Sequence, residues 1–287
     1  MQVNDVKVLA CYDGSVSAGV AIEVAARLLP RAHAQVAYVW APPYGSEGLR
    51  RRLWHSIGGV NEFVDAIERE GEAEAHRLAA MGVVLAGAHG WDAAPLVQRT
   101  FGGEGVHLAQ LAGETGVDLI VAGSRGLGGA KAVLGSVSDM IVHYAPCPVL
   151  IVPYPLLQAE HAALDSGPVV VGWDGSAGAE VTHRAVARLF PKRSVKPVFV
   201  PHGDVPAEHP AEGLTELPRL GVSVEHGRAV AAALAGAARD RHAALLAVGS
   251  LGHSTLREIV LGSVTLATLH HAFRPILVVP HRYTTDH

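Results

Sequence analysis

Residues 7–15 read KVLACYDGS, and residues 168–176 read PVVVGWDGS. Each segment is an apolar run of strand length that ends in Asp-Gly-Ser, and the two triplets lie 161 positions apart. The same offset matches the sequence ARL at 26–28 with ARL at 187–189 without a gap. Because identical motifs recur in the same order, the sequence indicates a tandem duplication of one unit.

The later parts of the two copies match at shorter offsets. Gly123-Ser124 matches Gly249-Ser250 at an offset of 126, and the GSV at 135–137 matches the GSV at 262–264 at an offset of 127. The second copy has therefore lost about 35 residues from its middle. The loss falls after its second apolar run, where a proline-rich connection extends over 201–218.

Five apolar runs in each copy alternate with helix-length amphipathic stretches. They lie at 7–11, 35–40, 83–86, 119–122 and 149–152, and again at 169–173, 195–200, 222–225, 244–248 and 276–279. Alternating strands and helices predict an α/β protein with two doubly wound, five-stranded parallel sheets. The continuous apolar character of the runs indicates that both faces of each sheet are covered.

Prolines and glycines without a clear period separate the copies. We therefore divide the chain into a first domain at 1–154, a linker at 155–167, and a second domain with a shortened middle at 168–282.

Charge and composition narrow the class of protein. The formal net charge is -4, and no block of Lys or Arg is longer than Arg50-Arg51-Arg52, so we expect no nucleic-acid partner. No apolar stretch reaches the roughly 20 residues of a membrane span, and the N-terminus lacks the pattern of a secretory signal. We expect a cytoplasmic protein without a membrane partner, in which Cys11 and Cys147 are buried free thiols.

The turns after strands one and four are the places where ligands bind in such sheets. After strand one, Asp13-Gly14-Ser15 supplies a carboxylate, a residue free to adopt positive φ, and a hydroxyl that can cap a helix beginning near Val16. The triplet can serve as a helix cap alone or as part of a binding site, and its recurrence at 174–176 discriminates only modestly between these roles.

After strand four, glycines and serines recur at fixed spacing. The first copy has Gly123 and Gly126, eight further residues, and then Gly135-Ser136. The second has Gly249 and Gly252, nine further residues, and then Gly262-Ser263. Glycines let backbone N–H groups point at one anion, and a helix N-terminus favours negative charge, so the pattern suits phosphate. A tight turn with close helix packing is the structural alternative.

Ser136 stands at the start of an apolar helical pattern. Val137, Met140, Ile141 and Tyr144 follow at spacings typical of one helix face, which predicts Ser136 as the N-cap.

These residues resemble the universal stress protein family, whose ATP-binding members carry G-x2-G-x9-G-(S/T) after the fourth strand and an Asp near the end of the first. The resemblance covers essentially the whole chain as a tandem pair, and it implies an adenine nucleotide alpha-hydrolase-like fold. In the family the last strands pair across a dimer. The segments 147–152 and 275–279 resemble those strands, which implies an intrachain pseudo-dimer and leaves a homodimer open.

The second copy matches the family pattern fully. The resemblance implies that Asp174 lies near the ribose and adenine, Val200 beside the base, and Gly249, Gly252, Gly262 and Ser263 around the phosphates. ATP, with Mg, is the implied ligand, and no redox cofactor is implied.

The first copy matches the same pattern with one departure. Its corresponding nucleotide-binding residues are Asp13, Val39, Gly123, Gly126, Gly135 and Ser136. The spacer 127–134 is one residue shorter than in the family. We therefore favour the second copy as the nucleotide-binding one.

No catalytic or metal site is predicted. The sequence has no Walker A motif, no H-E-x-x-H and no G-x-S-x-G, and its 17 histidines are scattered. His143 and His270 follow Ser136 and Ser263 by two helical turns, too far to activate a serine. Three functions stay open: a stress-response module that binds ATP or another adenine nucleotide, a scaffold acting through an unknown protein partner, and a weak ATP hydrolase.

Overall fold

The computed structural model describes residues 6–42, 59–124, 134–201, 211–218, 226–251, 261–271 and 273–284. The first copy contains β1 (Val6–Cys11), α1 (Val16–Leu28), β2 (Ala32–Trp40), α3 (Val60–Ala88), β3 (Asp92–Arg99), α4 (Glu104–Thr115), β4 (Leu119–Gly123), α5 (Ser136–Tyr144) and β5 (Val149–Val152). After α6 (Gln158–Ser166), the second contains β6 (Val169–Trp173), α7 (Ala177–Leu189), β7 (Val195–Phe199), β8 (Thr215–Glu216), α8 (His226–Asp240), β9 (Leu245–Gly249), α9 (Ser263–His271) and β10 (Ile276–Val279).

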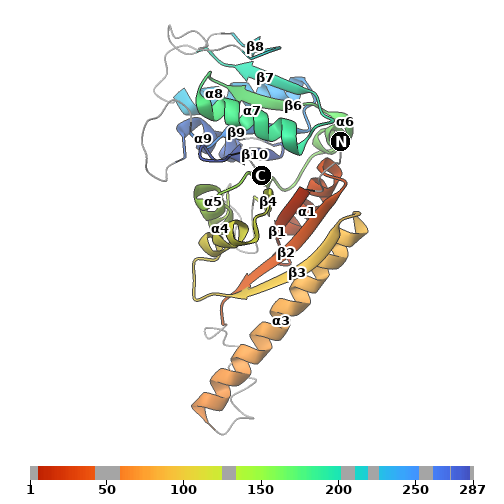
Figure 1. Ribbon diagram of the computed structural model, residues 1–287, viewed down its shortest axis with the longest axis vertical. Coiled ribbons are helices and arrows are strands. Elements are labelled where there is room, and N and C mark those ends of the chain that lie inside the picture. Colours follow the sequence, from red (N-terminus) through yellow and green to blue (C-terminus); the bar gives the residue numbers. More distant parts are fainter. Residues whose placement is uncertain are drawn as a thin grey trace.

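One continuous sheet runs through both copies in the order β3-β2-β1-β4-β5-β10-β9-β6-β7-β8 (Figure 1). Within each copy the strands are parallel, and the strand order reverses between β1 and β4 and between β6 and β9. The copies meet where β5 pairs antiparallel with β10, with Leu150 opposite Leu277. The predicted fold class and intrachain pseudo-dimer are therefore confirmed.

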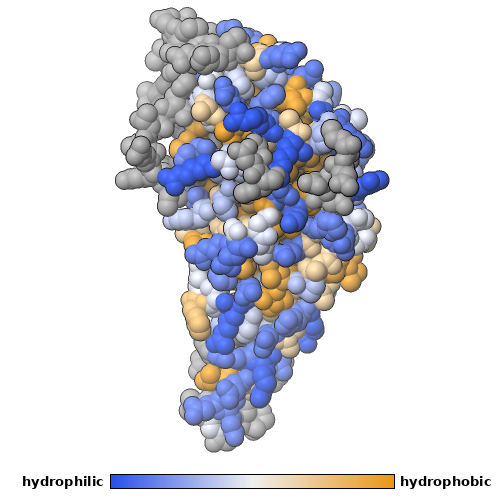
Figure 2. Space-filling view, viewed as in Figure 1, coloured by the Kyte–Doolittle hydropathy of each residue, from blue (hydrophilic) through white to orange (hydrophobic). Residues whose placement is uncertain are grey.

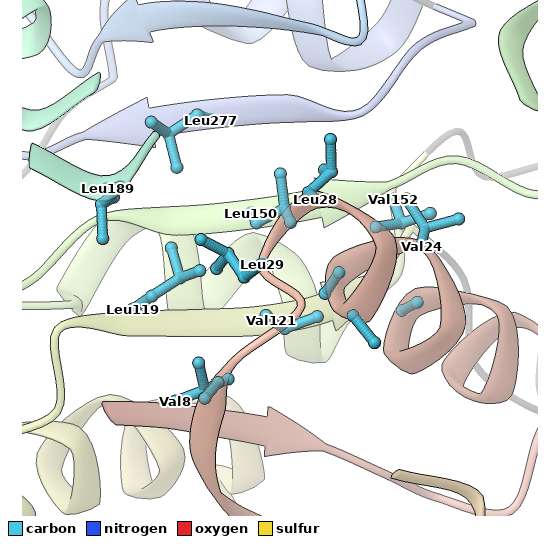
Figure 3. Close-up of a cluster of buried hydrophobic side chains, with 14 of the residues drawn as sticks. Val8, Val24, Leu28, Leu29, Leu119, Val121, Leu150, Val152, Leu189 and Leu277 are labelled. Atoms are coloured by element: carbon cyan, nitrogen blue, oxygen red, sulfur yellow. The ribbon is translucent and has the colours of Figure 1, made fainter. Parts of the chain in front are cut away.

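Two apolar cores cover the two faces of this sheet, and each core extends across both copies. Alternate residues of β4 show the division, because Leu119 and Val121 belong to one core and Ile120 to the other. Helices α1 and α7 pack on the first face, and α4, α5, α8 and α9 pack on the second. In Figure 3 the side chains of Leu150, Leu189 and Leu277 lie together at the junction of the copies. Burial on both faces explains the continuous apolar runs of the strands.

The third strand is not where the sequence predicted it. Residues 83–86 belong to the end of α3, and the strand is β3, which pairs with β2 over its whole length. Residues 83–86 continue helix α3, in which Val83, Leu85 and Ala86 pack on the core and Val84 is 73% exposed. Strand β3 escaped prediction because it is a partly exposed edge strand that contains Pro95.

Helix α3 runs past the carboxyl ends of β2 and β3 (Figure 1). Its 29 residues span roughly 43 Å at the usual helical rise. The projecting end is mainly hydrophilic (Figure 2), as expected for a segment in which Glu62, Asp65, Arg69, Glu70 and Glu72 are all exposed. The C-terminal part of α3 contributes Ala86 to the first core, with Val83 and Leu85 packed against it, and Ile67, Ala75 and Ala79 are also buried along the helix.

The predicted linker contains helix α6, which arginines from both copies hold in place. Arg27 of α1 donates to Asp165 at 2.6 Å, and Arg193 donates to the carbonyls of Leu164 and Gly167 at 2.5 and 2.9 Å. Arg274, which is 4% exposed, lies 3.8 Å from the buried Glu160. Helix α6 therefore contacts both copies and connects them.

A further ion pair joins the copies directly. Arg188 of α7 donates to Asp118 at 2.7 Å and to the hydroxyl of Tyr283 at 3.1 Å, while the backbone N–H of Lys7 donates to the other oxygen of Asp118. Both charged side chains are only 22 to 31% exposed, so water screens this pair less than a pair at the open surface.

On the side of the second copy, the short strand β8 is the last strand in the order of the sheet. Strand β8 has two residues and pairs with β7, and the predicted strand at 222–225 lies outside the described residues. The other strands predicted for the second copy agree with β6, β7, β9 and β10 to within one residue at each end.

Truncation at the junction should destabilise the whole chain. Leu277 is fully buried in the core that both copies share, so Leu277→Ala should lower the free energy of unfolding by about 2–5 kcal/mol. Urea denaturation followed by circular dichroism measures this loss. Leu157→Ala is the control, because Leu157 is 61% exposed and its removal leaves no cavity. Equal effects of the two substitutions would contradict the assigned role of the junction.

Candidate functional site

The predicted site residues gather at the carboxyl ends of the strands where the strand order reverses. In the first copy, Asp13 follows β1, Val39 lies near the end of β2, Gly123 ends β4, and Gly135-Ser136 begins α5. In the second, Asp174 follows β6, Val200 follows β7, Gly249 ends β9, and Gly262-Ser263 begins α9. Gly126 and Gly252 lie outside the described residues. Because β5 and β10 are antiparallel, the carboxyl ends of the strands point in opposite directions in the two copies. The two candidate pockets therefore lie at opposite ends of the strands.

The Asp-Gly-Ser triplets cap the helices that follow them. Ser15 accepts a hydrogen bond from the N–H of Ala18 at 3.1 Å, and Ser176 accepts one from the N–H of Ala179 at 3.2 Å. Asp174 accepts from both the N–H and the hydroxyl of Ser176, at 3.0 and 2.6 Å. The glycines between them have φ of 81° and 80°, a conformation that favours glycine. The triplets therefore fix two helix N-termini beside the pockets.

The ends of each glycine-rich loop are joined by equivalent hydrogen bonds. The N–H of Gly135 donates to the carbonyl of Ser124 at 2.7 Å, and the N–H of Gly262 donates to that of Ser250 at 2.8 Å. Side chains of the next helix reach the strand ends, because Ser138 donates to Gly123 O at 2.7 Å and Thr265 to Gly249 O at 2.6 Å. In both copies, the helix after the loop therefore begins beside the end of the fourth strand.

Gly123 and Gly249 allow the helix after strand one to approach the fourth strand closely. A Cβ on Gly123 would lie 2.5 Å from the hydroxyl and 2.9 Å from the carbonyl oxygen of Ser17. A Cβ on Gly249 would lie 3.3 Å from the carbonyl oxygens of Gly178 and Leu251 and from the hydroxyl of Thr182. Close helix packing thus accounts for these two glycines, as the structural alternative predicted.

Gly123 and Gly249 should differ in how well they tolerate substitution by alanine. Gly123→Ala should destabilise the protein by about 1–3 kcal/mol, because its Cβ forces the backbone of α1 away from β4. Gly249→Ala should cost less, since shifts of a few tenths of an ångström relieve its contacts. Thermal unfolding of the matched pair tests this order. A larger loss for Gly249→Ala would show that the helix spacing has been wrongly interpreted.

Helix α3 walls the first pocket. Leu78 lies 2.9 Å from the position of a Cβ on Gly14. Burial, together with the negative charges of Asp13 and Glu74, raises the pKa of the Tyr38 phenol. In the second copy, the described residues between β7 and α8 contain the short strand β8 and no helix, and residues 202–210 and 219–225 lie outside the described structure.

Ser136 and its helix depart in detail from the prediction. The N-cap of α5 is Gly135, and Ser136 is the first helical residue. The buried face comprises Ser138, Ile141 and Val142, whereas Val137, Met140 and Tyr144 are 37 to 44% exposed. The helix is rotated so that the Ser138 hydroxyl can reach β4. His143 hydrogen-bonds the carbonyl of Asp139 at 2.8 Å in its own helix, which leaves Ser136 without a base from this residue.

A polar groove of about 350 Å³ that the sequence did not indicate lies between α3 and the ends of β2 and β3. Arg99 is paired with both carboxylate oxygens of Glu68, at 2.8 and 2.6 Å, and lies 5.8 Å from the Trp40 ring and 5.0 Å from the Phe101 ring. These contacts attach α3 to β3, and the groove is separate from the predicted nucleotide pockets. Asp65, Glu68, Glu72 and His76 line it at helical spacing, a pattern visible in the sequence.

Both cysteines are free and pack in the same apolar core, but only Cys147 is buried as predicted, whereas Cys11 is partly exposed. Burial raises the pKa of the Cys11 thiol and of the Cys147 thiol to about 12, with smaller contributions from nearby negative charges. Since the thiolate is the reactive form, the raised pKa predicts slow reaction of both thiols at neutral pH.

Thiol titration tests this environment. With pKa values near 12, neither Cys11 nor Cys147 should react appreciably with a chromogenic disulfide reagent at pH 8 in the native protein. Both should react at once after unfolding in guanidinium chloride. Rapid reaction of either thiol in the native protein would contradict its assigned burial.

The described residues bring no three His, Cys, Asp or Glu side chains together in a way that could hold a metal ion. None of the helices in this part of the chain combines the length and apolar character needed to cross a bilayer.

Sequence comparison relates the chain to one family. The model of the universal stress protein family matches residues 6–153 and 216–280. A universal stress protein of Mycobacterium tuberculosis is 30% identical over 191 residues, which are 56% of this chain and 61% of that protein. The universal stress protein YxiE of Bacillus subtilis is 32% identical over 152 residues, 51% of this chain and 97% of that protein. The chain thus spans less than two thirds of the mycobacterial relative.

Structure comparison relates both copies to a known fold. The crystal structure of a universal stress protein from Archaeoglobus fulgidus aligns with 98% of this chain and 97% of its own, with a TM-score of 0.64 and 16% identity. At this identity the similarity concerns the fold.

Proposed function

Because the chain belongs to the universal stress protein family, we propose that it binds an adenine nucleotide, ATP with Mg in the first instance, in the pocket of its second copy. In this proposal Asp174 and Val200 contact the nucleoside, and Gly249, Gly252, Gly262 and Ser263 surround the phosphates. The chain would act as a regulatory module of the stress response in the cytoplasm. Its two units would be 1–154 and 168–282.

The convergence of two helix N-termini on the end of β9 carries this proposal. Gly178 in the first turn of α7 and Thr265 in the first turn of α9 both contact Gly249. The unpaired N–H groups and the dipoles of such termini favour a bound anion. Phosphate groups placed between them would meet positive partial charge from both sides.

The spacing of the loop favours the second copy. Nine residues separate Gly252 from Gly262, whereas eight separate Gly126 from Gly135. The loss of about 35 residues from the middle of the second copy favours the scaffold as the alternative function, because the corresponding region of the first copy contains α3. A scaffold of this fold would act through a protein partner and bind no nucleotide.

Calorimetric titration of ATP and Mg into the nucleotide-stripped chain distinguishes these functions. Gly262→Val should weaken binding at least about ten-fold, or 1.4 kcal/mol, because its side chain fills the anion-binding turn. Gly135→Val is the matched control in the first copy and should leave the affinity unchanged. Loss of binding only in Gly135→Val would move the site to the first copy. The absence of binding in the wild-type chain would favour the scaffold.

A further inference from the structure

Four polar side chains form a row along one side of helix α3. Asp65, Arg69, Glu72 and His76 follow one another at intervals of four, three and four residues, which places them on one face of the helix. All four are exposed, and all four line the polar groove between α3 and the ends of β2 and β3. We refer to these four residues as the α3 stripe. The groove is therefore bordered on one side by a regular row of acidic and basic side chains.

The side chains of the α3 stripe are unpaired. Within the described part of the chain, none of them takes part in an ion pair or a side-chain hydrogen bond, although residues three or four apart on a helix are close enough to pair. Their neighbours on the same helix differ, because Glu68 is paired with Arg99 and Glu74 with Arg77. The stripe is therefore free to contact side chains of another molecule.

The order of charges in the α3 stripe is complementary to the same order read in reverse. From its N-terminal end the stripe is acidic, basic, acidic and basic. A second α3 helix in antiparallel orientation therefore places Arg69 opposite Glu72 and Asp65 opposite His76. In a two-fold symmetric pair each of these contacts occurs twice. Every contact within the stripe then joins an acidic side chain to a basic one.

The shape of the first copy suits such a pair. Helix α3 runs past the carboxyl ends of β2 and β3, so that one end of it projects (Figure 1). In an antiparallel pair, the projecting end of each helix lies along the groove of the other molecule. Phe101, which is 83% exposed, lies 5.0 Å from the Arg99 guanidinium, and Arg99 lines the same groove. An exposed aromatic ring is thus available to the interface beside the charges.

We propose that the α3 stripe is a self-association surface, and that its partner is the α3 stripe of a second copy of this chain in antiparallel orientation. This interface is separate from the β5–β10 junction, which lies within one chain. Because exposed charges form it, we expect association to weaken as the salt concentration rises. The inference is independent of the proposed nucleotide binding.

Charge reversal within the stripe tests this inference by sedimentation velocity at low ionic strength. The wild-type chain should associate in a concentration-dependent way. Arg69→Glu and Glu72→Arg should each weaken association at least about ten-fold, because two-fold symmetry doubles every new contact between like charges. An equimolar mixture of the two variants should recover association. In the mixed pair, both positions are acidic in one molecule and basic in the other.

Two controls carry the same changes of charge away from α3. Arg184 and Glu180 form an exposed ion pair on α7 of the second copy, so Arg184→Glu and Glu180→Arg should associate as the wild type does. Circular dichroism verifies that all four variants are folded. A wild-type chain that stays monomeric at every concentration would overturn the inference. Association of Arg69→Glu or Glu72→Arg equal to that of its control, or a mixture that fails to associate, would overturn it as well.

Discussion

The antiparallel pairing of β5 with β10 is the contact on which the rest of this structure depends. It joins two parallel five-stranded sheets into one, and it lets both apolar cores continue from copy to copy. Each of these strands has only four residues, all buried. Side chains such as Leu150 and Leu277 therefore serve the interior of both copies at once. The ion pair between Arg188 and Asp118 and the contacts of helix α6 further stabilise this junction, which depends mainly on hydrophobic burial.

The same pairing separates the two candidate pockets. Each candidate pocket lies at the carboxyl ends of its own strands. Because the junction is antiparallel, these ends point in opposite directions in the two copies. The first copy has the long helix α3 over its outer strands, while the second copy is about 35 residues shorter in this region and has the short strand β8 among its described residues. The two candidate pockets thus share the capped helix and the joined loop ends, and differ in the length of the chain that follows the second strand.

The sequence predicted secondary structure best for strands that are buried on both faces of the sheet. Strands buried on both faces, such as β4 and β9, produce continuous apolar runs, and the repeated Asp-Gly-Ser marks the helix starts at Val16 and Ala177. Strand β3 lacks this signal because it is an edge strand, and residues 83–86 resemble a strand although they lie in a helix that leaves Val84 exposed. The close approach of Gly178 to the carbonyl oxygen of Leu251, 73 positions away, is likewise a contact that no local pattern reveals. The exposure of Val137 and Met140 likewise follows from the rotation of α5 toward β4.

Joining the copies within one polypeptide changes the thermodynamics of their association. Two separate subunits that met through such a short pair of strands would dissociate on dilution, because their association would follow mass action. The covalent connection through α6 replaces that bimolecular step with an intramolecular one, for which a fixed effective concentration applies. The β5–β10 interface of this chain is therefore equally complete at any protein concentration, and one copy can diverge in sequence without losing its partner.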